Sequence, residues 1–347
     1  MSEVPGAPDG GPYPDPRSAF LLTVATFVAS GFIGIFFLGL GAVAANGIGQ
    51  AVAVGTIATI SAKRIPEPQA ERIGLRSFDP RALPMVLCLV PAILLGSELD
   101  NYATDWSPVD VEAGLEAEED AGSSVDSVGG PFEETADDAS AEAAENASNE
   151  AASKAFPGIG EGFASENGAT EVELSPEAVA LEELRVDLDD PWTLAQAFVI
   201  SVGITPVVEE FFFRGVLQQS LVARLGLARG IGFVALLYTL PHLPAVATLP
   251  RFLAGIVSAF GIGCLLGLVR VATGSILASI ILASLTAGVG ILSFAVRENL
   301  PLPGMNVEGT HLPITVTIAS IVVVAWAAHA VYEEATKKFE AELLREK

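Results

Sequence analysis

The chain has 347 residues, of which 51% are hydrophobic and 17% are charged, and its formal net charge is -24 at pH 7. Its mean hydropathy is +0.51, and the apolar residues gather in blocks close to the length of a transmembrane helix. This excludes an ordinary soluble domain and predicts an all-α polytopic membrane protein. We expect contact with the lipid bilayer and no nucleic-acid partner.

The negative charge belongs to one segment of the chain. Residues 98–190 carry 27 Asp and Glu against only Lys154 and Arg185, whereas the rest of the chain carries 15 acidic and 16 basic residues. A segment with low hydrophobicity and high net charge cannot bury enough apolar surface to offset the entropy lost on ordering. We therefore predict that residues 100–190 form an acidic, low-complexity, disordered insert.

The apolar blocks predict about eight transmembrane helices, three before the insert and five after it. A Pro- and Gly-rich tail, residues 1–17, is expected to be disordered, and residues 18–99 are expected to hold the first three helices. Residues 18–62 contain no charge over 45 positions, which is enough for two spans, and a third block covers about 83–99. The five later blocks, followed by a charged soluble helix at 333–347, cover about 191–223, 230–248, 251–271, 275–296 and 313–332.

The distribution of Lys and Arg predicts the orientation. Basic residues of short loops tend to stay on the cytoplasmic side. With eight spans and a cytoplasmic N-terminus, thirteen basic residues fall on the cytoplasmic side and four on the opposite side. We therefore expect both termini in the cytoplasm and take the membrane to be a bacterial inner membrane.

Three ionisable residues, Glu209, Glu210 and Arg214, interrupt an otherwise apolar run. Ionisable residues at membrane depth are costly and usually mark a functional site. On a helix, Glu210 and Arg214 are four positions apart and can pair, whereas Glu209 points about 100° away from them. The pattern predicts a supporting pair, Glu210 with Arg214, and a free carboxylate, Glu209, that can act as a general base.

His242 is the candidate partner of Glu209. If the turn near 224–229 lies at the cytoplasmic side, Glu209 and His242 lie roughly 21 Å and 18 Å from it, at about 1.5 Å of rise per residue. A Glu and a His at one depth can hold and activate a water molecule. A Glu–His–Arg network that only orients helices remains an alternative. We expect His329 to pack in the last span or lie at its interface, and His311 to be exposed in the loop at 297–313.

Two motifs resemble those of a known family. Glu209-Glu210-x-x-x-Arg214, followed by Tyr238-x-x-x-His242, resembles the CPBP family of intramembrane proteases, the CAAX-processing and bacteriocin-immunity (Abi) group. The resemblance covers about residues 190–296 and implies a protease core within 191–332. It also implies that Glu209 is the base, that His242 is its partner, and that Glu210 and Arg214 support them. Tyr238, a further supporting residue, stands where the family usually has Phe.

The resemblance leaves the cofactor open. Many members are labelled metalloproteases, and a purely glutamate-dependent mechanism is also argued for the family. No cofactor is therefore certain, and a zinc ion held by Glu209 and His242 is one alternative.

A third motif of this family departs from its pattern here. Where the family commonly has His-x-x-x-Asn or His-x-x-x-Asp, this chain has Ser284 and Gly288. The family's His and Asn are thought to bind the substrate carbonyl or the developing oxyanion. Ser can donate one hydrogen bond and Gly has no side chain. Ser279, Ser284 and Thr286 are the candidates to replace the missing donors.

These observations favour an intramembrane endopeptidase of the CAAX prenyl protease type, acting on a membrane-associated peptide or protein. The alternative is a catalytically impaired member that binds a membrane partner or acts as an immunity protein. A transporter or ion carrier is a third hypothesis, because intramembrane carboxylates also mark ion paths. It is weakened because no internal repeat with paired broken helices is present.

Overall fold

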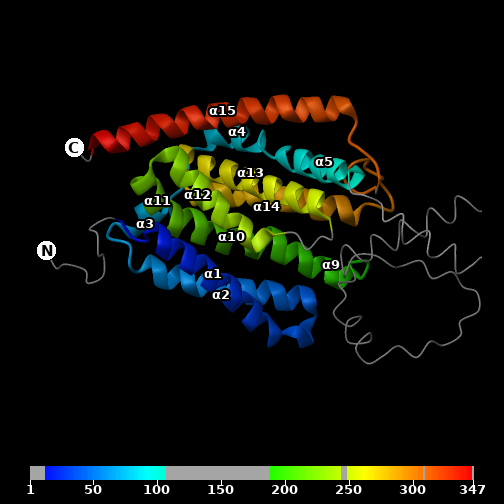
Figure 1. Cartoon of the computed structure of the whole chain (residues 1–347), viewed down its shortest axis with the longest axis horizontal. Helices are drawn as coiled ribbons and strands as arrows, with labels where there is room; N and C mark the ends of the chain where they lie inside the picture. Colours follow the sequence, from blue (N-terminus) through cyan, green and yellow to red (C-terminus); the bar gives the residue numbers. More distant parts are fainter. Residues whose placement is uncertain (1–11, 107–187, 244–247, 308, 346–347) are drawn as a thin grey trace, which may run out of the picture.

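The computed structural model describes residues 12–106, 188–243, 248–307 and 309–345, and these residues form a bundle of helices without strands (Figure 1). The predicted all-α fold is therefore confirmed. Most of the predicted acidic insert lies outside the described residues, as does most of the predicted N-terminal tail. Residues 100–105, which we assigned to the insert, are instead the end of a helix.

The first two helices form an antiparallel hairpin, α1 (Pro16–Ile35) and α2 (Ala42–Ala62), joined by the short 3₁₀ turn η1 (Leu38–Leu40). The side chain of Asp15 accepts a hydrogen bond from the backbone N–H of Ser18, and Pro16 begins the helix, where its missing N–H costs nothing. The two helices approach closely because Gly49 lacks a Cβ, which would otherwise lie 2.8 Å from the backbone nitrogen of Gly34.

The third predicted span is a broken helix. Short elements α3 (Gln69–Ile73), η2 (Pro80–Ala82) and α4 (Leu83–Leu87) lead to α5 (Ala92–Asp105). The break falls just before Pro91, which has no N–H to donate and whose ring crowds the carbonyl four residues earlier. The α-helical winding is therefore interrupted within Pro80–Asp105, a segment of 26 residues that is long and apolar enough to cross a membrane.

A continuous helical segment of 35 residues, Pro191–Leu225, follows the insert. It consists of α9 (Pro191–Phe198), the π-helical η3 (Val199–Ile204), α10 (Thr205–Glu210), the π-helical η4 (Phe211–Leu217) and α11 (Gln218–Leu225). Pro206 cannot donate the usual hydrogen bond one turn back, which accounts for the looser winding in η3. π-Helical turns within α-helices are frequent at functional sites, and here they flank the two adjacent carboxylates.

The remaining helices complete the bundle. They are α12 (Leu227–Thr239) with the 3₁₀ turn η5 (Leu240–His242), α13 (Leu249–Thr273), α14 (Ile276–Ala295) and α15 (Ile314–Arg345). Among the described residues, seven helical segments are long and apolar enough to cross a membrane. The predicted block 230–248, the fifth of the eight in chain order, coincides with the 13-residue helix α12, which is shorter than a span, and residues 244–247 of this block lie outside the described residues. In place of a separate soluble helix at 333–347, residues 333–345 continue the last span without a break.

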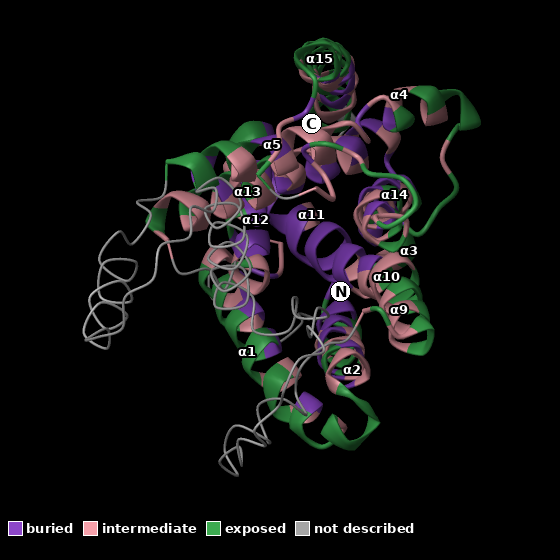
Figure 2. Ribbon diagram, turned by 90° about the vertical axis from the view of Figure 1, so that its right-hand side faces the viewer, coloured by how far each residue is buried: buried purple, intermediate pink, exposed green. Residues whose placement is uncertain are grey.

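Figure 2 shows exposed residues along α1 and α15 and buried residues between the central helices. The exposed set includes many large apolar side chains, and the buried set includes polar ones. Large hydrophobic side chains on α1 and α15 are exposed, among them Phe32 and Trp326, whereas Arg214, Gln218 and Ser279 are fully buried. This distribution fits lipid surroundings and supports an integral membrane protein. Helix α1 begins and α15 ends at the same end of the bundle (Figure 1).

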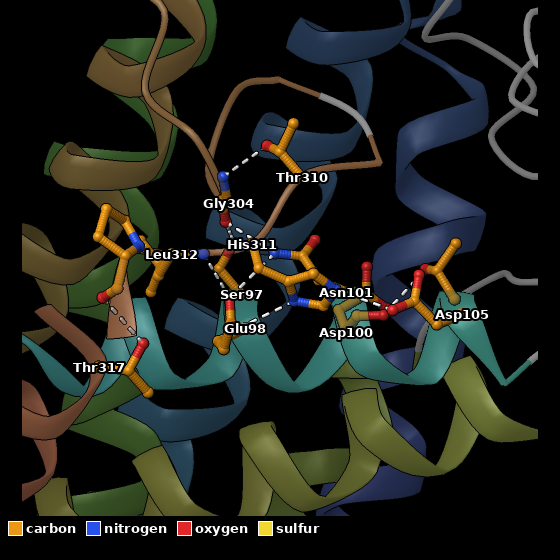
Figure 3. Close-up of polar contacts among 12 residues, drawn as sticks. Ser97, Glu98, Asp100, Asn101, Asp105, Gly304, Thr310, His311, Leu312 and Thr317 are labelled. Carbon is orange, nitrogen blue, oxygen red and sulfur yellow. Dashed lines mark hydrogen bonds and ion pairs between the residues drawn. The ribbon is translucent and has the colours of Figure 1, made fainter. Parts of the chain in front are cut away.

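At the opposite end, the loop before α15 is fastened to α5 through His311 (Figure 3). His311 Nδ1 lies 3.0 Å from Glu98 Oε1, and His311 Nε2 lies 2.8 Å from Asp105 Oδ2. The Tyr102 ring packs against the imidazole, with centroids 4.5 Å apart. Glu98 also accepts the backbone N–H of Leu312 at 2.9 Å. Our expectation that His311 is simply exposed is therefore wrong, because both ring nitrogens meet carboxylates.

Other polar contacts reinforce this loop attachment. The Ser97 hydroxyl and the Asn101 side-chain amide both donate to the carbonyl oxygen of Gly304, at 2.7 Å and 3.0 Å. From α13, Arg251 reaches the neighbouring carboxylate of Asp100 with two nitrogens, at 2.9 Å and 3.2 Å. The carboxylates that face His311 are thus Glu98 and Asp105, while Asp100 is paired elsewhere.

We predict that the stability contributed by His311 depends on pH. Hydrogen bonds to two carboxylates raise the pKa of His311 above its ordinary value of about 6.5, and the bond to Asp105 contributes more than the bond to Glu98. A raised folded-state pKa gives stability that is complete below the ordinary value and is lost as pH rises through the raised value. His311→Gln should therefore lower the melting temperature by several degrees at about pH 5.5 and by much less at about pH 9.

The matched control is His329→Gln on α15, because His329 is 72% exposed and lies 3.4 Å from Glu333 within one helix. This variant should change the melting temperature little at either pH. Equal effects of His311→Gln at the two pH values would contradict the proposed charged state of His311.

Candidate active site

Glu209 and Glu210 end helix α10 in the interior of the bundle, 4% and 1% exposed. They are consecutive on one helix, so their side chains leave it in different directions. Glu210 faces Arg214 on the same helix and the helices α13 and α14. Glu209 faces α2 and the end of α12. The site therefore has two sides, and the two carboxylates have different neighbours.

On the first side, Glu210 and Arg214 form a buried ion pair. Glu210 Oε1 lies 2.9 Å from Arg214 Nη1, and Arg214 Nη2 donates to the carbonyl oxygen of Gly263 on α13 at 3.1 Å. The Ser279 hydroxyl of α14 donates to the carbonyl of Ile276 at 2.9 Å and lies within reach of the Glu210 carboxylate. This arrangement ties the central helix to α13 and contains the predicted pairing of Glu210 with Arg214.

Tyr238 connects the ion pair to the histidine. The guanidinium carbon of Arg214 lies 4.3 Å from the centroid of the Tyr238 ring, close enough for a cation–π interaction. The same ring packs against the imidazole of His242, with centroids 4.1 Å apart and the planes inclined by 30°. Phe213 meets Tyr238 edge to face at 5.3 Å. Tyr238 thus lies between Arg214 and His242, and its supporting role stays a prediction.

On the second side, Glu209 and His242 lie together. Glu209 Oε2 is 3.5 Å from His242 Nε2, and His242 Nδ1 is 2.8 Å from the carbonyl oxygen of Tyr238. A carbonyl can only accept, so Nδ1 carries a proton. In the neutral ring, Nε2 is then an acceptor facing a second acceptor, the Glu209 carboxylate. A donor with two hydrogens, such as water, would satisfy both acceptors, and such an arrangement suits general-base chemistry.

Gln50 of α2 is a neighbour of Glu209 that we did not predict. Its side-chain nitrogen Nε2 donates to Glu209 Oε1, and its oxygen Oε1 accepts from the Thr205 hydroxyl at 3.3 Å. The available signal was the presence of an amide in a membrane span. Gln50 and Asn46 are the only side-chain amides in the charge-free run 18–62, and polar residues inside spans generally face a partner.

The third-motif positions lie on α14, and among the described residues no hydrogen bond or ion pair joins them to Glu209. Gly288 is buried against η3, where an added Cβ would lie 3.9 Å from the methyl groups of Val202. Val202 precedes Glu209 by seven residues, or about 10 Å of helical rise. Ser284 is half-buried. The Thr286 hydroxyl, a candidate replacement donor, bonds to the carbonyl of Ala283 in its own helix at 2.9 Å.

The remaining metal-ligating side chains do not extend the site. Among the described residues there is no group of three or more His, Cys, Asp and Glu side chains placed to hold a metal ion. Glu209 and His242 supply two ligands, whereas a catalytic zinc usually has three from the protein. His329 lies exposed on α15, and His311 belongs to the loop attachment at the far end of α5. Within the part of the chain that the structure describes, Glu209 and His242 therefore do not belong to a complete zinc ligand set.

Comparison with known proteins identifies the segment that carries this site. Residues 191–288 match the family model described as type II CAAX prenyl endopeptidase Rce1-like. The matched range includes both motifs and both third-motif positions, so the predicted resemblance is confirmed for this segment. No curated protein and no solved structure matches the chain.

We predict that the buried ion pair is required for folding. Removing one partner of a buried pair leaves an uncompensated charge, which typically costs about 3–5 kcal/mol. Glu210→Ala and Arg214→Ala should each strongly reduce the folded yield and the melting temperature of the purified protein. Size-exclusion chromatography with thermal unfolding measures both quantities.

Glu334→Ala provides the matched control, because Glu334 and Lys338 have the same spacing on α15 but are 46% and 42% exposed. An exposed pair is worth about 0–1 kcal/mol, so this variant should behave like the parent protein. A Glu210→Ala variant as stable as Glu334→Ala would refute the supporting role.

Proposed function

Because residues 191–288 match the Rce1-like family of type II CAAX prenyl endopeptidases, we propose that this chain is a CAAX-type intramembrane endopeptidase. It hydrolyses a peptide bond with a water molecule activated by Glu209 and His242. The observation that carries the proposal is the 3.5 Å approach of Glu209 Oε2 to His242 Nε2 inside an apolar bundle. The substrate is a membrane-associated peptide or protein, and we place both termini in the cytoplasm of a bacterial cell.

The proposed reaction uses these two side chains on one water. The water donates one hydrogen to Glu209 Oε2 and the other to His242 Nε2, so its oxygen lone pair is free for the carbonyl carbon of the substrate. As the new C–O bond forms, Glu209 takes the proton. The C–N bond then breaks and Glu209 returns that proton to the leaving amine. One water is consumed, and a carboxylic acid and an amine are formed.

His242 is oriented for this role before the substrate binds. Its Nδ1 donates to the Tyr238 carbonyl and its ring lies against the Tyr238 ring, so the Nε2 lone pair is directed toward Glu209. Preorganisation of this kind avoids reorganisation during the reaction. The mechanism needs no metal, and metal analysis of the purified protein tests whether a metal joins Glu209 and His242.

Stabilisation of the oxyanion is the weak part of this site. In the family, the third motif is thought to bind the substrate carbonyl, and here its positions are Ser284 and Gly288. Loss of one oxyanion donor typically costs about 10²–10³ in rate. We therefore propose a slow peptidase. The same observation favours the second candidate, a catalytically impaired member that binds a membrane partner or acts as an immunity protein.

We predict that Glu209→Gln abolishes peptide hydrolysis. The amide keeps the shape of the side chain but cannot take a proton, so the rate should fall by at least about 10²–10⁴. The assay uses full-length protein in vesicles with a membrane-anchored fluorogenic peptide, with and without a prenylated cysteine. Glu333→Gln, at a half-exposed carboxylate on α15, is the control and should keep the parental rate. Undiminished hydrolysis by Glu209→Gln would refute the assignment.

We also predict that restoring the third motif increases activity. Positions 284 and 288 lie one turn apart on the same face of α14, and the surroundings of Gly288 leave room for a side chain to begin. Ser284→His with Gly288→Asn should raise the rate on the same peptide by up to about 10²–10³ if an oxyanion donor is what is missing. A double variant that is stable but no faster would show that the third-motif positions do not limit the reaction.

A further inference from the structure

Gln50 meets the carboxylate of Glu209 from outside the family-matched segment. It lies on α2, and it is half-buried between that helix and α10. The two hydrogen bonds of its side-chain amide form a chain that runs from Thr205 to Glu209. The Thr205 hydroxyl donates to Gln50 Oε1, and Gln50 Nε2 donates to Glu209 Oε1. Because an ionised carboxylate only accepts, the nitrogen of the amide must face Glu209, and the Thr205 hydroxyl then suits the amide oxygen.

This chain of hydrogen bonds determines which oxygen of Glu209 is available. Gln50 occupies Oε1, and the other oxygen, Oε2, is the one that faces His242 Nε2 at 3.5 Å. Without a partner on Oε1, the carboxyl group can rotate about its terminal bond, whose torsional preference is broad. The amide of Gln50 therefore holds the carboxylate plane in the orientation that presents Oε2 to the histidine.

The packing of α2 is built to bring Gln50 to this position. A Cβ at Gly47 would lie 2.6 Å from side-chain carbons of Ile200, and a Cβ at Gly49 would lie 2.8 Å from the backbone nitrogen of Gly34. Side chains at these two positions would force α2 away from η3 on one side and from α1 on the other. These two glycines, which both lie just before Gln50 on α2, thus permit the close approach that its hydrogen bond requires.

We propose that Gln50 is a positioning residue for the general base Glu209, with Thr205 orienting its amide. The inference rests on the proposed peptidase function for its kinetic consequence, whereas the hydrogen bond itself can be tested separately. It assigns part of the site to the N-terminal hairpin. Helices α1 and α2 then act in catalysis through Gln50 and do not serve only as a membrane anchor.

The kinetic test compares Gln50→Leu, Gln50→Glu and the control Asn46→Leu in the full-length protein. Asn46 is an exposed amide one turn earlier on α2, so its replacement changes the same helix without touching Glu209. Gln50→Leu should lower kcat by about 10²-fold, the cost typical of a misplaced catalytic group, with KM unchanged. Gln50→Glu puts a second ionisable carboxyl beside the base, so its pH–rate profile should gain an additional titration. Asn46→Leu should change neither quantity.

A merely structural role for Gln50 predicts a different result. Loss of folded protein would lower the amount of active enzyme and would leave the shape of the pH–rate profile unchanged. A Gln50→Leu variant with the parental kcat, or a Gln50→Glu variant with the parental pH profile, would overturn the proposal.

A second measurement does not depend on peptidase activity. A hydrophobic carbodiimide that modifies buried carboxyl groups is added to the parent protein and to Gln50→Leu, and labelling of Glu209 is measured by mass spectrometry, with buried Glu98 as the internal reference. Labelling of Glu209 should become several-fold faster once the amide no longer holds the carboxylate. If the parent protein cleaves no peptide but this change is seen, the peptidase function fails and the positioning role stands. Equal labelling rates would overturn the positioning role.

Discussion

The structure depends on the buried ion pair between Glu210 and Arg214. Two adjacent carboxylates inside a membrane bundle would repel each other and lack hydration. The guanidinium of Arg214 compensates one of them at 2.9 Å, and its second nitrogen bonds to a backbone carbonyl of α13. Breaking such a pair is far more costly than forming it is favourable. The pair therefore serves mainly to hold the central helix in one rotation about its axis.

That rotation separates the functions of the two carboxylates. With Glu210 directed to Arg214 and α14, Glu209 is directed to His242 and α2. Tyr238 links the two sides, since its ring contacts both the guanidinium of Arg214 and the imidazole of His242. A displacement of Arg214 would therefore move the Tyr238 ring and, through that ring, His242. The supporting pair and the proposed reactive pair are in this sense one packed unit.

The local pattern of the central helix was predictable because it depends on neighbours four residues apart. The pairing of Glu210 with Arg214 and the separate direction of Glu209 follow from helical geometry alone. The approach of Gln50 to Glu209 was not predictable in this way, because these residues are 159 positions apart in sequence. Their contact depends on how α2 packs against α10. The break before Pro91 and the short α12 were missed because hydropathy measures apolar length and does not register where a helix ends. The role of His311 was missed because its partners Glu98 and Asp105 come from a distant segment.

In the proposed mechanism, one water molecule lies between Glu209 and His242. An experimental structure of the full-length protein in lipid, at a resolution that shows ordered water, tests it most directly. We expect water-sized density within hydrogen-bond distance of both Glu209 Oε2 and His242 Nε2, with the Gln50 amide on the other carboxylate oxygen, Oε1. A direct Glu209–His242 hydrogen bond that leaves no room for water, or a Glu209 side chain turned away from His242, would contradict it.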